Sequence, residues 1–68
     1  RIDDIQWYRD HEHLLLSTGG KLYFYEIDVR GGINSYELTD LPDRQFYYDA
    51  DDNAVYKMAG NQIVRLKF

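Results

Sequence analysis

Hydrophobic and polar positions alternate along much of this chain with a period of two, as side chains do on the two faces of a β-strand. Ile5 and Trp7 alternate with Gln6 and Tyr8, and residues 14–16 form an apolar run of strand length. No segment shows a convincing helical period. The pattern therefore predicts an all-β fold, with strands at 5–8, 14–16, 21–28, 33–38, 45–48, 54–58 and 62–68.

Turn-forming residues separate these predicted strands. Gly19-Gly20 tolerates the positive φ angles of a tight hairpin, and Gly31-Gly32 predicts a further turn. Pro42 cannot donate to a strand ladder, so the segment 40–43 interrupts the pattern. The remaining turns are expected at 10–13, 49–53 and 59–61.

The chain also nearly repeats itself. A shift of 40 residues places Gly20 on Gly60, Trp7 on Tyr47 and 14–16 on 54–56. One residue inserted after Gly60 then aligns 22–27 with 63–68. A repeat of roughly 40–45 residues filled with short strands is typical of a β-propeller blade, which buries its faces only by stacking on neighbours. We therefore predict a four-stranded blade at 1–39, a linker at 40–44 and a partial, three-stranded blade at 45–68.

The repeat also predicts which side chains share a face. Trp7 and Tyr47 are expected at equivalent positions in successive first strands, pointing the same way. In the third strands, one set is expected to be buried and the other to face outward or toward a neighbouring blade. The first set is Tyr23, Tyr25 and Ile27 with Val64, Leu66 and Phe68, and the second is Phe24 and Glu26 with Arg65 and Lys67.

Composition narrows the class of protein. The 68 residues suffice for one small domain, and their net charge of −4 disfavours a nucleic-acid platform. There are no cysteines, and no apolar run approaches the roughly 20 residues of a membrane span. Because the chain begins at Arg1 and its only methionine is Met58, we expect a portion of a longer protein. The missing fourth strand of the second unit would then be supplied from upstream of Arg1, with Phe68 near the parent's C-terminus.

Two segments carry residues that bind metals. His11 and His13 flank Glu12, but no further histidine or cysteine completes a three- or four-ligand site. The segment 49–53 has the D-x-D-x-N opening of a calcium loop, yet Ala54 and Gly60 stand where that loop needs glycine and glutamate. We therefore expect turns at both places, with no metal and no cofactor.

The many aromatic side chains raise the alternative of a sugar or peptide platform, since rings with polar tips are favoured at binding sites. Stacked blades, however, cover both faces of each sheet, so we expect most of these rings to be packing residues. The candidate nucleophiles Ser17, Thr18 and Ser35 lack a glycine-flanked elbow, and neither histidine lies at a suggestive spacing. We therefore expect no catalytic residues. The seven platform candidates are Tyr8, Tyr23, Phe24, Tyr25, Tyr47, Tyr48 and Tyr56.

The stretch 7–39 resembles a TolB-type β-propeller repeat. The matching positions are Trp7, Asp10, the apolar run 14–16, Ser17, Gly19-Gly20, 22–27, Asp28, Gly31-Gly32 with Asn34, and Leu38-Thr39. The Ser-Pro-Asp-Gly turn of that repeat is here Tyr8-Arg9-Asp10-His11, and the second unit keeps an aromatic residue at Tyr47 and little else. The chain is also similar to the propeller-like C-terminal region of bacterial PEGA-domain proteins.

This resemblance implies a blade and leaves the function open, because propellers serve as scaffolds and as enzymes. We expect a non-catalytic structural or protein-interaction module, set in a bacterial cell-envelope or surface protein. Its partners would be another protein, further blades of the parent chain or a second copy, without nucleic acid or membrane insertion. Two alternatives remain: accessory blades of a prolyl-oligopeptidase-type hydrolase, and a free-standing small β domain that binds a ligand through its aromatic face.

Overall fold

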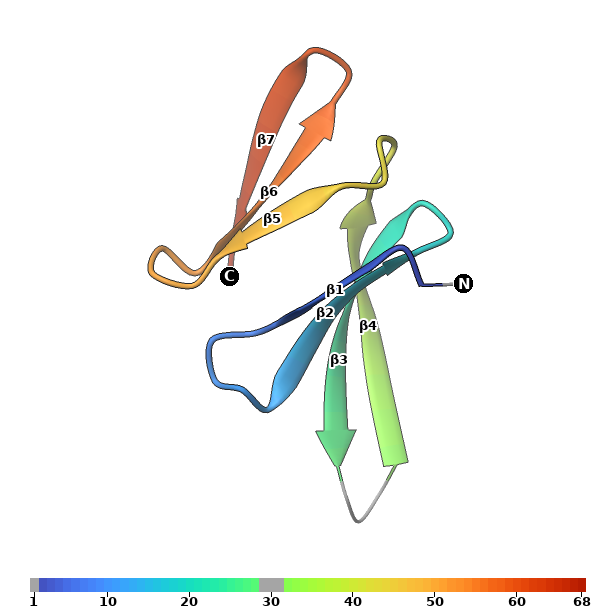
Figure 1. Cartoon of the computed structure of the whole chain (residues 1–68), viewed down its shortest axis with the longest axis vertical. Coiled ribbons are helices and arrows are strands. Elements are labelled where there is room, and N and C mark those ends of the chain that lie inside the picture. The colour runs from blue at the N-terminus through green and yellow to red at the C-terminus, as the bar shows by residue number, and fades with distance from the viewer. Residues whose placement is uncertain (1, 29–31) are drawn as a thin grey trace.

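The computed structural model describes residues 2–28 and 32–68, and all regular structure in these residues is β-strand (Figure 1). The all-β prediction is confirmed. The seven strands are β1 (Asp4–Trp7), β2 (His13–Thr18), β3 (Lys21–Asp28), β4 (Gly32–Asp40), β5 (Phe46–Asp49), β6 (Ala54–Ala59) and β7 (Gln62–Lys67).

The strands form two antiparallel meanders. The first sheet has the order β1-β2-β3-β4 and the second has the order β5-β6-β7. Four strands followed by three fit the predicted blade and partial blade. Strand β4 continues through Asp40, so the irregular link between the sheets is 41–45. The predicted turn at Gly31-Gly32 lies partly outside the described residues.

The β2–β3 and β6–β7 hairpins have the predicted tight turns. Gly19 and Gly20 both have positive φ, 58° and 78°, which matches the type I′ geometry that suits the twist of a hairpin. Gly60 has φ 65° in the second hairpin. Side chains other than glycine rarely adopt these angles, and this explains why glycine occupies both turns.

The hydrophobic core lies between the two sheets. Leu15 and Leu22 of the first sheet and Val55 of the second are almost completely buried. Leu41, in the link, is equally buried, and its backbone NH donates to the carbonyl of Gly20 at 2.7 Å. The cluster consists of Leu15, Leu22, Leu41, Phe46, Tyr48 and Val55, with Tyr8 and Phe24 packed against it.

Strand pairing corrects the predicted repeat by one residue. Thr18 pairs with Lys21, and Ala59 pairs with Gln62, so the two hairpins correspond at a shift of 41 residues. The same shift carries the Trp7–Leu14 pair onto Tyr48–Val55. Trp7 therefore corresponds to Tyr48, and its predicted equivalence with Tyr47 is wrong.

This shift also decides how the sheets stack. We call the face of each sheet that includes these Trp7 and Tyr48 positions its upstream face, and the opposite face its downstream face. The downstream face of the first sheet packs on the upstream face of the second, so both sheets point their equivalent faces the same way. Such repetition is what consecutive blades require.

The facing predicted for the third strands is right only in part. Val64 and Leu66 are half-buried on the core side of β7, whereas Phe68, which was expected to be buried, is 43% exposed. Leu66 pairs with the buried Val55, and Phe68 contacts rings of the first sheet, so this side of β7 faces the core.

On β3, Phe24 packs toward the second sheet, which agrees with its predicted facing toward a neighbouring blade. Tyr23 and Tyr25, which were expected to be buried, lie half-buried on the upstream face. The first sheet contributes its downstream face to the interface between the sheets, and the second contributes its upstream face. Equivalent residues of β3 and β7 therefore cannot both point into this interface. The facing predicted for Ile27 lies outside the described side chains.

Candidate functional site

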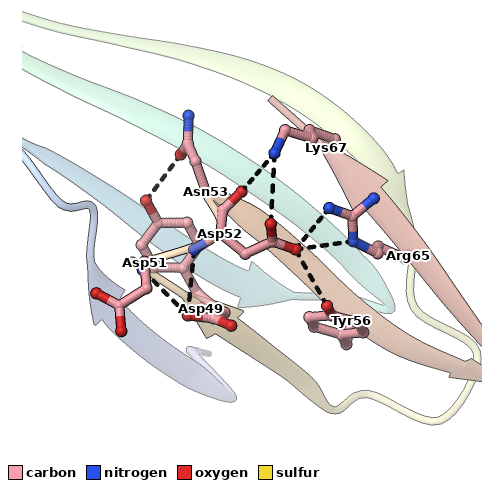
Figure 2. A network of polar contacts seen from close by, with 8 residues as sticks. Asp49, Asp51, Asp52, Asn53, Tyr56, Arg65 and Lys67 are labelled. Carbon is pink, nitrogen blue, oxygen red and sulfur yellow. Dashed lines mark hydrogen bonds and ion pairs between the residues drawn. The ribbon is translucent and has the colours of Figure 1, made fainter.

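The acidic turn 49–53 is held by hydrogen bonds within the second sheet (Figure 2). The Asp49 carboxylate accepts the backbone NH groups of Asp51 and Asp52 at 3.0 and 3.4 Å. The Tyr48 hydroxyl donates to the side-chain oxygen of Asn53 at 2.9 Å. Asn53 has φ 52°, a left-handed angle that asparagine tolerates better than most residues.

Asp52 is the centre of the charges in this turn. Its Oδ2 accepts from Nε of Arg65 at 2.9 Å and from the Tyr56 hydroxyl at 3.3 Å, and Lys67 donates to its backbone carbonyl at 2.9 Å. The hydrogen bond from Arg65 lowers the pKa of Asp52, and the Lys67 charge adds to this effect. These contacts come from β6 and β7, so they fasten the turn to its own sheet (Figure 2).

This geometry favours a structural role for the D-x-D-x-N segment. The Asp49 carboxylate accepts two backbone NH groups, and the Asp52 carboxylate is paired with Arg65 and Lys67. Within 2–28 and 32–68, the structure brings together no group of three or more acidic, histidine or cysteine side chains suited to a metal. The expectation that no metal binds tightly stays a prediction.

The second predicted metal segment separates its two histidines. His11 occupies the turn after β1 with φ 59°, whereas His13 begins β2 and stacks on Phe24 with ring centroids 4.8 Å apart. Nδ1 of His13 lies 2.5 Å from Oδ2 of Asp10, and its Nε2 lies 3.6 Å from Oε2 of Glu26 on β3. The imidazole is thus placed between two carboxylates on an aromatic ring.

Burial and hydrogen bonding act in opposite directions on this group. Desolvation lowers the pKa of His13, but the contacts with Asp10 and Glu26 outweigh it, and the net pKa is raised above 6.5. Desolvation raises the pKa of Asp10, yet hydrogen bonds from the Glu12 backbone and from His13 bring it below 3.8. The charged pair is therefore favoured in the folded state.

An aromatic cluster next to His13 joins the sheets. The Tyr8 ring stacks on Tyr48 at 5.3 Å and meets the edges of Phe24 at 5.1 Å and Phe68 at 5.2 Å. These four rings come from both sheets, so their contacts stabilise the interface between them. Tyr8, Phe24 and Tyr48, three of the platform candidates, are therefore packing residues.

Two polar side chains also bridge the sheets. The Gln6 amide donates to the carbonyl of Phe46 and accepts from the backbone NH of Tyr48, both at 3.3 Å. This places β1 beside β5, as Figure 1 shows. Lys57 donates to the Thr39 hydroxyl at 2.6 Å and to the backbone carbonyl of Asp40 at 2.8 Å.

The upstream face of the first sheet carries apolar side chains in two rows across the strands. Trp7, Leu14 and Tyr25 form one row, and Ile5, Leu16 and Tyr23 form the other. Trp7 is 57% exposed and Ile5 is 48% exposed.

The downstream face of the second sheet is apolar around Tyr47, Met58 and Ile63, while Arg65 and Lys67 occupy its other end. Tyr47 is 62% exposed and Ile63 is 70% exposed, and both line a depression of about 240 Å³. Tyr56 and Met58 belong to the same lining. We call the upstream face of the first sheet and the downstream face of the second sheet the two open faces. They carry the four remaining platform candidates, Tyr23, Tyr25, Tyr47 and Tyr56.

The candidate nucleophiles are spread over the first sheet. Ser17 is buried on the downstream face of the first sheet, and its hydroxyl has no hydrogen-bond partner among the described residues. Ser35 lies exposed on β4 beside Tyr25, and Thr18 ends β2.

Comparisons with known proteins give no family model that matches the chain and no significant match among curated proteins or solved structures. Within the described ranges, no helix is long and apolar enough to cross a membrane.

Pairing across strands is the feature that the sequence patterns missed. Glu26 meets His13 because β2 and β3 pair at this register, and the two residues are far apart in the chain. Period-two alternation states which residues share a face, but not which residues of two strands are opposite. The contact between Asp10 and His13, by contrast, is local, because the two residues are three positions apart in one turn.

Proposed function

We propose that this chain is a two-blade segment of a β-propeller that acts as a non-catalytic structural or protein-interaction module. The observation that carries the proposal is the pair of open faces, on which Trp7 and Ile63 are largely exposed. Both faces correspond, through the repeat, to faces that are packed inside the chain. A setting in a bacterial cell-envelope or surface protein is supported by the sequence resemblance alone.

The contrast between open and packed faces supports an interaction role. The polar network of Asp52, Arg65 and Lys67 stiffens one end of the second sheet without covering Tyr47 or Ile63. Large apolar side chains left in water cost free energy that contact with a partner would recover. A self-contained β domain has no need of such faces on both sides.

Thermal melting of the dilute 68-residue chain in the presence of an apolar fluorescent dye tests this function. A segment with two open faces should melt at low temperature and bind the dye while still folded, as judged by circular dichroism. A high, cooperative melt with no dye binding to the folded state would contradict the proposal and indicate a free-standing β domain.

A second candidate function is supported by the depression on the downstream face of the second sheet. Tyr47 and Tyr56 lie on it with ring centroids 6.4 Å apart, and Met58 and Ile63 complete an apolar lining. Such a surface suits a small ligand with a flat apolar face. The sheet-stacking function is preferred because it accounts for both open faces.

A further inference from the structure

The two open faces lie on opposite sides of the molecule. The upstream face of the first sheet and the downstream face of the second sheet both point away from the shared core. Each has two of the most exposed large hydrophobic side chains, Ile5 with Trp7 and Tyr47 with Ile63. In a two-fold symmetric dimer both copies bury the same face. Such a dimer would therefore cover only one of the two open faces of each copy.

The 41-residue register relates each open face to a packed one. Trp7 and Leu14 correspond to Tyr48 and Val55, which are packed against the first sheet. In the other direction, Tyr56 and Ile63 correspond to Leu15 and Leu22, which are packed against the second sheet. The open faces are thus the two halves of the interface that the chain already makes internally.

We propose that a second copy of this chain covers these faces by head-to-tail association. The downstream face of one copy's second sheet binds the upstream face of the next copy's first sheet, which continues the internal stacking. This proposal rests on the proposed function and names the partner. Because the contact is heterologous, it gives a ring where the rotation closes. Propellers close at about four to eight blades, which corresponds to roughly two to four copies.

Two charge substitutions, each confined to one open face, provide the test. Trp7→Glu places a carboxylate on the upstream face of the first sheet, and Ile63→Glu places one on the downstream face of the second. Each variant alone should lose the oligomer that the parent chain forms in analytical ultracentrifugation. Mixing the two should restore association as a 1:1 pair of about twice the 8.1 kDa chain mass, because each variant retains the face that the other lacks.

Tyr36→Glu is the matched control. Tyr36 is 55% exposed and pairs with Phe24, so it lies at the edge strand on the downstream side of the first sheet, away from both open faces. This variant should associate like the parent chain. Circular dichroism establishes that each variant is folded, and the mixed pair provides a second check, since an unfolded variant could not restore association.

Three outcomes would overturn the proposal. A parent chain that is monomeric at the highest soluble concentration would do so, as would an Ile63→Glu or Trp7→Glu variant that still self-associates like the parent. Failure of two folded variants to pair on mixing is the third. A monomeric chain that binds the apolar dye would leave the interaction function standing with another partner, whereas a monomer with a high melt and no dye binding would remove both.

Discussion

At the scale of single residues, His13 combines a ring contact with two ion pairs. Its ring stacks on Phe24, while Asp10 and Glu26 lie at its two nitrogens. Asp10 also accepts the backbone NH groups of Glu12 and His13, at 2.8 and 3.1 Å, so it shapes the turn and orients the imidazole. The turn therefore depends on the ionisation of these groups.

The stability of the folded chain should depend on pH through His13. Because the folded-state pKa of His13 is raised above 6.5, its contribution is fully present below that pH and is lost as the pH rises through the raised pKa. The contribution of Asp10, whose folded-state pKa is below 3.8, is lost only as the pH falls through that lowered pKa. The melting temperature should therefore be lower at pH 8.5 than at pH 6.

His13→Gln should remove this decline, and His11→Gln, which changes the other histidine of the same turn, should preserve it. Circular dichroism melts of the three proteins at matched pH values make the comparison. A decline that persists in His13→Gln would show that another group is responsible.

At the scale of strands and sheets, the alternating pattern was a good guide to which residues form strands and a poor guide to which face they occupy. All seven strands lie within a few residues of their predicted positions, because glycine turns and apolar alternation are local signals. The error of one residue in the repeat arose because the extra residue lies before the second unit and not after Gly60. A single-residue error exchanges the two faces of a strand, and the shift of 40 therefore pairs Trp7 with Tyr47 in place of Tyr48.

Truncations on the two faces of the stack should differ in cost. Leu15→Ala removes a fully buried side chain from the interface between the sheets and should lower the free energy of unfolding by about 2–5 kcal/mol. Ile63→Ala, at a side chain that is 70% exposed, should change it by less than about 0.5 kcal/mol. Urea unfolding of the dilute proteins measures both values, and equal losses would contradict the placement of the core.

At the scale of the whole molecule, the chain is more extended than its length requires. Its Cα radius of gyration is 12.0 Å, compared with about 11 Å for a compact domain of this size. Its principal extents of 43 × 28 × 15 Å describe an elongated and thin molecule. The order of the strands in each sheet follows from the sequence. Which face of each sheet lies in the interface does not, because it depends on contacts between residues about 41 positions apart in the chain.

Joining two copies in one chain tests the central claim, that these sheets stack in series, most directly. A flexible glycine-serine linker of about ten residues would connect Phe68 of the first copy to Arg1 of the second. The measurement is the thermal melt of this tandem protein beside the single chain, with a tandem bearing Ile63→Glu in both copies as the length-matched control. Serial stacking predicts a melt raised by about 5 °C or more, independent of protein concentration and absent in the control, whereas a tandem that melts with the single chain would contradict it.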